Sequence, residues 1–144
     1  MALRISLRDG EKFVINGAVL RAVGRTTFRV ENTVAMLRGR DVMTPEQVNS
    51  PARRLYFACM MAYIDPTEEA RHQDSIVELV RQFIDVLSSP EARATCISFA
   101  QKVATRDYYR ALADCRWLID YEAEALARPD AAPDAAAIPT AAAA

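Results

Sequence analysis

Histidine and glycine, on which many catalytic and ligand sites depend, are scarce in this chain of 144 residues. His72 is the only histidine, so a serine or cysteine nucleophile has no second imidazole to use, and most acyl-transfer arrangements are excluded. Glu68 and Glu69 share a helix face with His72, but a di-metal bundle site needs a second Glu-x-x-His segment, which the sequence lacks. We interpret these three residues as a solvated charged face and expect no metal.

The few glycines form no nucleotide-binding loop, because their spacing matches neither a G-x-G-x-x-G pattern nor a P-loop, and it is typical of turns. They are Gly10, Gly17, Gly24 and Gly39. The carboxylate pairs Glu122 with Glu124 and Asp114 with Asp120 do not converge on one helix face, so we assign them to the surface. The sequence therefore predicts a protein that is not an enzyme and that binds no cofactor.

Disulfides and membrane spans are not expected either. Cys59, Cys96 and Cys115 are odd in number, widely spaced and set among apolar residues, which is typical of reduced cysteines in a core. No apolar run approaches ~18 residues, and no basic segment precedes an apolar stretch at the start. We expect a cytoplasmic protein without a membrane partner.

Charge divides the chain into two parts. Residues 1–54 contain nine Arg and one Lys against five acidic residues, a net charge of +5, whereas the remainder has eight basic and fourteen acidic residues, a net charge of −6. Sixteen of the eighteen basic residues are arginine, whose planar fork pairs with phosphate and stacks on bases. A genome rich in GC also favours arginine codons, so the position of the arginines is more informative than their number.

The N-terminal part has the period-2 pattern of short strands. Leu3, Ile5 and Leu7 alternate with polar residues. Turn signals at Asp9-Gly10, Asn16-Gly17 and Gly24 separate further segments rich in β-branched and aromatic residues, at 11–15, 18–23, 26–32 and 33–38. Asn-Gly also tolerates the positive φ of a tight type I′ hairpin. Residues 1–43 are therefore predicted to form an antiparallel β-meander that closes into a small sheet or barrel.

The pattern changes to helices at the segment TPEQVNSP (44–51), which contains two cap-then-proline signals. Residues 55–64 carry no charge and predict a helix that is buried nearly all round and ends at Asp65-Pro66. Further helices are predicted over 67–88, from Pro90 and from Thr105. The fold class is thus α+β, with a helical bundle over 44–127 and a disordered Ala/Pro tail over 128–144.

The last predicted helix has an apolar stripe and an aromatic pair on the other side. The stripe consists of Tyr108, Leu112, Cys115, Ile119, Ala123 and Leu126. Trp117 and Tyr121 fall away from it, so either this helix is covered on both faces or the pair forms a partner-binding patch. Both alternatives stay open at this point.

Several strings together resemble the FlbT family of flagellar biosynthesis regulators: MALRISLRDGEKFVINGAVLR, RTTFRVEN, Leu37-Arg38 and TPEQVNSPARRLYFACMMAYID. The resemblance implies a post-transcriptional regulator that binds the 5′ untranslated region of flagellin mRNA and represses its translation or promotes its degradation. It also implies FlaF as a partner, with flagellin itself and a second copy of the chain as further candidates. In some members the family's effect is positive, which leaves the sign of regulation open.

A fainter resemblance is to the CsrA family of RNA-binding regulators. Leu7-Arg8-Asp9-Gly10-Glu11 matches the opening of their small sheet, and Leu37-Arg38 occupies the closing place. Leu7 stands where that family usually has the first arginine of a pair. From this resemblance we expect Arg8 and Arg38 to meet at one edge of the sheet, and their joint change to Glu to weaken RNA binding about a hundredfold with little effect on folding.

Basic side chains spread over the exposed face or edge of a sheet can bind a phosphate backbone, while backbone groups at an edge read unpaired bases. The candidate RNA-binding residues are Arg4, Arg8, Arg21, Arg25, Arg29, Arg38 and Arg40. The alternative is a protein-interaction module, in which the acidic helical part holds FlaF or flagellin and effects on RNA are indirect. Salt-dependent binding to a leader RNA distinguishes the two hypotheses.

Overall fold

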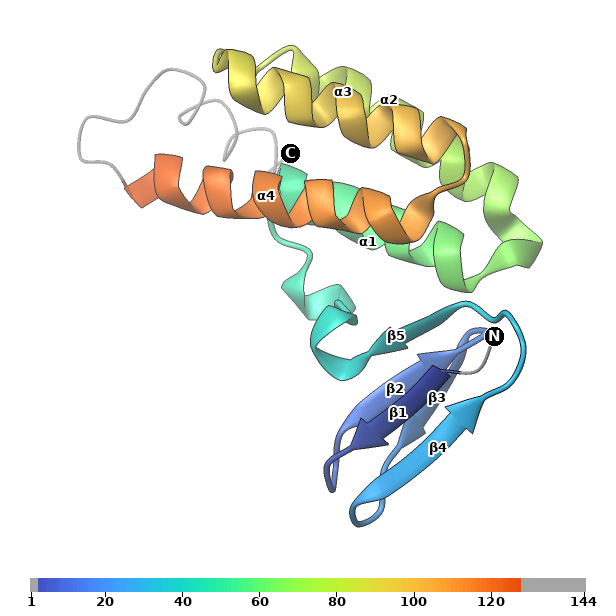
Figure 1. Cartoon of the computed structure of the whole chain (residues 1–144). Helices are drawn as coiled ribbons and strands as arrows, with labels where there is room; N and C mark the ends of the chain where they lie inside the picture. The colour runs from blue at the N-terminus through green and yellow to red at the C-terminus, as the bar shows by residue number, and fades with distance from the viewer. Residues whose placement is uncertain (1–2, 128–144) are drawn as a thin grey trace. The chain divides into compact units, whose positions relative to one another are not determined.

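The computed structural model describes residues 3–127, so the predicted tail at 128–144 lies outside the described residues. The described chain contains antiparallel strands followed by four α-helices, which confirms the α+β class (Figure 1). It divides into two compact units. The strand unit comprises the described residues of Met1–Val42 together with Ile64–Pro66, and the helical unit comprises those of Met43–Tyr63 together with Thr67–Ala144.

The first four strands form one long antiparallel hairpin around Asn16-Gly17. They are β1 (Leu3–Leu7), β2 (Lys12–Ile15), β3 (Ala18–Arg21) and β4 (Thr26–Val30). β2 pairs with β3, and β1 pairs with β4. In every pair, the two partner residues are the same number of positions away from the Asn16-Gly17 turn. Asn16 and Gly17 have φ values of 49° and 85°, which confirms the predicted type I′ turn.

Both arms of the hairpin leave the strand conformation at the same distance from the turn, at residues 8–11 and 22–25. The Gly10 amide donates to the Ala22 carbonyl at 2.8 Å, and the Gly24 amide donates to the Asp9 side chain at 2.7 Å. β1–β4 therefore forms a separate two-stranded sheet, while β5 (Met36–Arg38) joins β2 to complete a sheet of order β3-β2-β5. The expected sequential meander is thus wrong in its pairing: β1 pairs with β4 rather than with β2.

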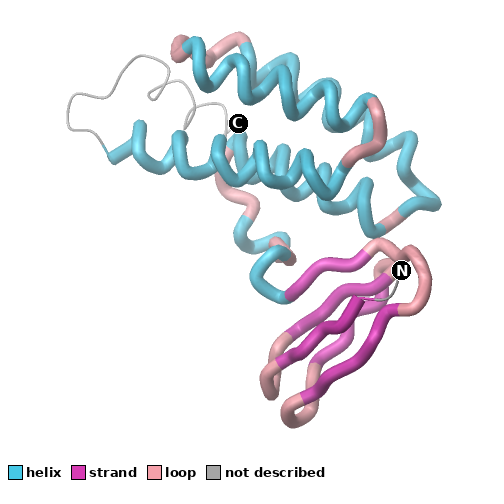
Figure 2. The backbone as a smooth tube through the Cα atoms, viewed as in Figure 1, coloured by secondary structure: helices cyan, strands magenta, loops and turns pink. Residues whose placement is uncertain are grey.

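The two small sheets share one apolar core. The buried side chains of Ile5 and Leu7 come from β1, and that of Phe13 comes from β2. The Phe13 ring meets the Phe28 ring of β4 edge to face, with centroids 5.3 Å apart. Figure 2 shows the strands that supply these residues in magenta. One face of the β1–β4 sheet is consequently occupied by the core, and its other face remains for polar side chains. The central strand β2 of the second sheet is buried on both faces, since Phe13 and Val14 are each 1% exposed.

The helical unit contains α1 (Pro51–Ile64), α2 (Glu69–Ile84), α3 (Pro90–Ala104) and α4 (Tyr108–Ala127), with short 3₁₀ turns at Gly39–Asp41, Pro45–Gln47 and Pro66–Glu68 in the chain. The predicted capping box at Thr44 and Gln47 is present. α1 ends at Ile64 as predicted, and no residue of α1 is exposed. The Ser89 hydroxyl accepts the Ala92 amide at the start of α3.

The buried face of α4 differs from the predicted stripe in its second half. Tyr108, Leu112 and Cys115 are buried as expected, but Ala123 and Leu126 are exposed. Their places in the core are taken by three other residues, namely Leu118, Glu122 and Ala125. Both sets of positions satisfy a helical period. The apolar pattern alone therefore could not distinguish them, and its prediction for Ala123 and Leu126 is wrong.

Glu122 is therefore buried, only 3% exposed, and its assignment to the surface is wrong. Its Oε2 accepts the backbone amide of Ala52 at 3.2 Å, in the first turn of α1, and Ser50 also hydrogen-bonds the carboxylate. The first amides of a helix have no partner within the helix, and a carboxylate there also interacts favourably with the helix dipole. Glu122 thus caps a helix that lies seventy positions earlier in the sequence.

Candidate nucleic-acid interface

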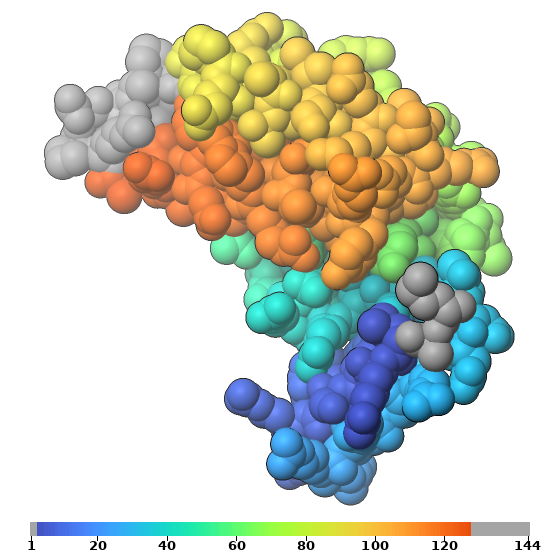
Figure 3. Space-filling view, in the orientation of Figure 1, coloured from blue at the N-terminus to red at the C-terminus, as the bar shows by residue number. Residues whose placement is uncertain are grey.

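The sheet formed by β1 and β4 exposes arginines on the face away from the core. Arg4 lies directly opposite Arg29 in the register, and both side chains are exposed. Their strand neighbours Ile5 and Val30 are buried, because successive side chains of a strand point to opposite faces. Figure 3 shows β1 and β4, in dark and light blue, at the surface of the strand unit. The alternation of β1 therefore places Arg4 on the solvent face.

Arg8 and Arg25 continue the same register one position beyond the paired strands. Leu7 pairs with Thr26, so Arg8 and Arg25 are the next residues on the two chains, and both are exposed. With about 3.4 Å per residue, the distance along the strand from Arg4 to Arg8 is roughly 14 Å. We call the four residues Arg4, Arg8, Arg25 and Arg29 the arginine face. It is long enough to contact several phosphates of one strand.

The centre of the arginine face is polar and uncharged. Ser6 lies opposite Thr27, and their hydroxyl oxygens are 3.3 Å apart, within hydrogen-bonding distance. Hydroxyl groups can donate to and accept from phosphate oxygens or base edges. The surface between the two arginine pairs therefore offers hydrogen bonds without an opposing negative charge.

None of the four arginines of the arginine face forms an ion pair within residues 3–127. Like charges directly opposite each other on an antiparallel pair are destabilising, by an amount comparable to the 0.2–1 kcal/mol that a favourable pair contributes. Arg4 and Arg29 are such a pair. An anion bound between them would remove the repulsion, so the arrangement is suited to a phosphate.

The second sheet repeats the arrangement at a position that the sequence analysis missed. Lys12 of β2 lies opposite Arg21 of β3, and both are exposed. The signal was available, since a two-residue turn at Asn16-Gly17 fixes the pairing of Ile15 with Ala18, and hence of Lys12 with Arg21. Lys12 therefore joins Arg21 as a candidate phosphate contact.

Arg38 differs from the other arginines because it already has partners. Its Nη2 donates to the Ser6 carbonyl at 2.8 Å and forms an ion pair with Glu11 Oε2 at 3.2 Å. Glu11 also accepts the backbone amide of Arg8 at 3.0 Å, and this bond, together with the nearby guanidinium of Arg38, lowers the pKa of the Glu11 carboxyl. β5 pairs with β2 and not with β1, yet Arg38 of β5 still contacts β1 through its hydrogen bond to the Ser6 carbonyl. It is exposed, but it also has a structural role.

Arg40 lies in the 3₁₀ turn Gly39–Asp41 that follows β5, and its side chain is exposed. It belongs to neither of the like-charge pairs. The structure thus places Arg4 and Arg29 on the β1–β4 sheet and Arg8 and Arg25 directly beside its end, and it leaves Arg21, Arg38 and Arg40 outside that group.

Trp117 and Tyr121 of α4 form a parallel stack, with ring centroids 5.7 Å apart and an interplanar angle of 5°. Both are half-buried. They line an open hollow of about 510 Å³ together with four acidic and polar residues from α4 and from the start of α3, namely Ser89, Glu91, Asp120 and Glu124. The pair is therefore neither fully covered nor fully exposed.

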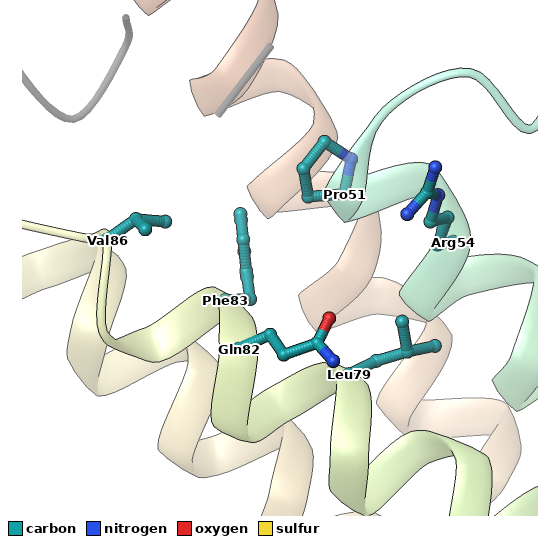
Figure 4. Close-up of a pocket in the computed structure, with 6 residues that line it drawn as sticks. All are labelled: Pro51, Arg54, Leu79, Gln82, Phe83 and Val86. Atoms are coloured by element: carbon teal, nitrogen blue, oxygen red, sulfur yellow. The ribbon is translucent and has the colours of Figure 1, made fainter. Parts of the chain in front are cut away.

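Little in the described residues resembles a catalytic centre. A pocket between α1 and α2 has a volume of about 20 Å³, room for little more than one water molecule, and Figure 4 shows Phe83 pointing across it toward Pro51. Residues 3–127 contain no group of three metal-ligating side chains. Cys59, Cys96 and Cys115 are buried thiols without a disulfide, which confirms their assignment to the core. Burial raises the pKa of Cys59 to about 12 and that of Cys96 to about 11.

No helix in the described part of the chain has the length and apolar character needed to span a bilayer. The fold and the surface together define an α+β protein with a basic strand unit and a separate helical unit. The family model described as "Flagellar protein FlbT" matches residues 3–126, and the chain belongs to the FlbT family.

Curated relatives agree with this assignment. The chain is 39% identical over 127 residues, 88% of its length and 90% of the other, to the "Probable flagellum biosynthesis repressor protein FlbT" of Caulobacter vibrioides (strain NA1000 / CB15N). Proteins with the same description from Rhodopseudomonas palustris (strain TIE-1) and Agrobacterium fabrum (strain C58 / ATCC 33970) are each 31% identical. Those matches cover 89% of this chain and 100% of the first, and 91% of this chain and 88% of the second. No solved structure matches.

Proposed function

We propose that this protein represses flagellum biosynthesis in the cytoplasm by binding the 5′ untranslated region of flagellin mRNA, which lowers translation of the message or promotes its degradation. Its relatives are described as flagellum biosynthesis repressors. The observation that carries RNA binding is the like-charge pair of Arg4 and Arg29 in the exposed arginine face, whose arginines form no ion pair within the described residues.

The arginine face suits a single strand better than a duplex. It lies on one face of a short two-stranded sheet, and the deep, narrow major groove of an RNA duplex does not admit side chains to its base edges. Sequence-specific RNA recognition mostly targets unpaired loops and ends, whose bases are accessible to side chains. In this proposal the guanidinium groups hold the phosphates, and the hydroxyls of Ser6 and Thr27 contact the strand between them.

The other candidate arginines extend this surface. Arg21 with Lys12 provides a second cation pair, and Arg40 adds a further exposed charge. Arg38 can contact RNA only if it shares its guanidinium with Glu11 and the Ser6 carbonyl. The proposal therefore gives Arg38 a smaller share of the binding energy than Arg4 and Arg29.

Salt dependence of binding tests the proposal. Purified protein is titrated into a labelled flagellin leader RNA at several salt concentrations. If the four arginines each neutralise one phosphate, the logarithm of the affinity should fall with the logarithm of salt with a slope of about −3, since each contact on a single strand contributes about −0.7. A slope near zero, or equal affinity for an unrelated duplex of the same length, would contradict it.

A second candidate function is a protein-interaction module that acts on flagellin synthesis through FlaF or flagellin, with or without self-association. The hollow beside Trp117 and Tyr121 favours it, because half-buried aromatic residues at a surface are typical of binding sites. Under this alternative the protein binds its partner with no measurable affinity for the leader RNA.

A further inference from the structure

One helical face of α4 combines the aromatic stack with carboxylates. Trp117, Asp120, Tyr121 and Glu124 follow the spacing i, i+3, i+4 and i+7, so they form one stripe along the helix. The first turn of α3 adds Glu91 beside this stripe. We call the hollow that these residues line, about 510 Å³ in volume, the acidic–aromatic groove.

The three carboxylates of the groove are exposed, and within the described residues none of them forms an ion pair. Other acids of the helical unit are paired: Asp114 with Lys102, and Glu69 with Arg106. The nearby cation of α3, Arg93, donates instead to the carbonyls of Ile84 and Leu87 at the end of α2. The negative charge of the groove is therefore not compensated by these cations.

We infer that the acidic–aromatic groove is a docking site for an arginine-bearing segment of a partner polypeptide. A guanidinium stacks on an aromatic face and pairs with carboxylates at the same time, which an ammonium does less well. The groove provides both features within one hollow. Carboxylates repel phosphates, so the occupant is a protein segment and not RNA.

This inference goes beyond the proposed RNA-binding function because it concerns the helical unit and not the strand unit. It also gives Trp117 and Tyr121 a partner of defined chemistry. Neither alternative of the sequence analysis holds in full, because both rings are half-buried and line an open hollow.

Trp117 is the only tryptophan of the chain and so reports on the groove directly. The full-length protein is titrated with an arginine–glycine repeat peptide and with the matching lysine–glycine peptide while tryptophan emission is recorded. The arginine peptide should change the emission in a saturable, salt-sensitive manner and bind at least about threefold more tightly than the lysine peptide.

A pair of matched variants separates the groove from the overall charge. Asp120→Asn/Glu124→Gln should weaken binding of a fluorescent arginine peptide about tenfold, because two exposed carboxylate contacts are lost. Asp74→Asn/Asp85→Asn makes the same change in charge at exposed positions of α2 and its end, and it should change the affinity by less than about twofold. Both variants should keep the leader RNA affinity of the parent, so a failure here differs from a failure of the proposed function.

Three results would overturn the inference. Trp117 emission could be insensitive to the arginine peptide, or both double variants could lose affinity equally, which would indicate general electrostatics. The emission could also change with protein concentration alone, in which case a second copy of the chain occupies the groove.

Discussion

The two units of this protein use their charged residues differently. In the helical unit, the Nζ of Lys102 lies 2.8 Å from the Oδ2 of Asp114, and the Ser98 hydroxyl hydrogen-bonds the same oxygen. Because Ser98 and Lys102 belong to α3 and Asp114 to α4, this ion pair helps to join the two helices. In the strand unit, the described arginines form a single ion pair, that of Arg38 with Glu11. Cationic charge thus mostly pairs within the helical unit, and in the strand unit it remains available to an anionic ligand.

This difference supports the strand unit as the site of the proposed RNA binding. Opposed cations such as Arg4 and Arg29 cost the folded sheet some stability, because nothing in the described chain neutralises them. The strand unit can bear that cost, since both of its sheets pack on the core around Phe13. The net charges of the two units do not show which of their cations are paired.

The largest expected effect tests whether the two units fold separately. Phe13 and Phe99 are almost completely buried, in the strand unit and in the helical unit respectively. Truncation of either to Ala should cost about 3–5 kcal/mol of stability. We expect Phe13→Ala to lose leader RNA binding while the helical circular dichroism signal stays, and Phe99→Ala to weaken that signal. Loss of the helical signal in Phe13→Ala would show that the units unfold together.

The next effect concerns the arginine face. Arg4→Glu/Arg29→Glu should weaken binding to the leader RNA about a hundredfold, because two forked phosphate contacts are replaced by repulsion. A fluorescence anisotropy titration at one fixed salt concentration measures this change.

Two further variants sharpen that result. Arg71→Glu/Arg81→Glu makes the same change in charge on exposed positions of α2, and it should change RNA affinity by less than about threefold. Arg38→Glu would also break the contacts with Glu11 and Ser6, so its melting temperature must be compared before its affinity is interpreted. Equal losses in the two double variants would remove the distinction between the units.

The sequence predicted the type and position of most elements, and local signals explain why. Asn16-Gly17 and the Ser50-Pro51 pair act within a few residues, and the structure has a turn and a helix start at those places. The pairing of β1 with β4 was missed because Asp9-Gly10 has the form of a hairpin turn. Its true role depends on Gly24, which faces it across the hairpin and binds the Asp9 side chain.

The candidate site was only partly predictable for a similar reason. Exposure of the arginines follows from strand alternation, but the opposition of Arg4 and Arg29 depends on a pairing between distant segments. The clearest error of the sequence-based prediction is the assignment of Glu122 to the surface. Its burial depends on the amide of Ala52 at the start of α1, and no pattern within α4 reveals that need.

A smaller expected effect is a pH dependence of the free energy of unfolding that is caused by Glu122 in the helical unit. Burial raises the pKa of its carboxyl above the usual value of 4.5, against opposing hydrogen bonds from Ser50 and Ala52. A raised pKa in the folded state means that the stability contribution is complete below about pH 4.5 and is lost as the pH rises through the raised value. The free energy of unfolding of the parent, relative to Glu122→Gln, should therefore decrease from acidic to neutral pH.

Urea denaturation at several pH values measures this difference. Glu122→Gln keeps an acceptor for the Ala52 amide, whereas Glu122→Leu leaves that buried amide without one and should cost about 1–3 kcal/mol more. A difference between parent and Glu122→Gln that is constant with pH would mean that the carboxyl is not perturbed by burial.

The smallest effect concerns Arg106, where the helical unit holds a charged residue in a strained backbone. Arg106 has a φ of 64°, and it closes α3 with its amide on the Val103 carbonyl and that of Asp107 on the Lys102 carbonyl, a position that glycine usually occupies. Its side chain compensates through an ion pair with Glu69 at 3.0 Å. Arg106→Ala loses the pair and keeps the strain, whereas Arg106→Gly loses the pair and relieves the strain. The Gly variant should therefore be about 1 kcal/mol more stable than the Ala variant in thermal unfolding. If the Ala and Gly variants are equally stable, the left-handed backbone carries no cost here, and the contribution of Arg106 to stability lies in its ion pair with Glu69.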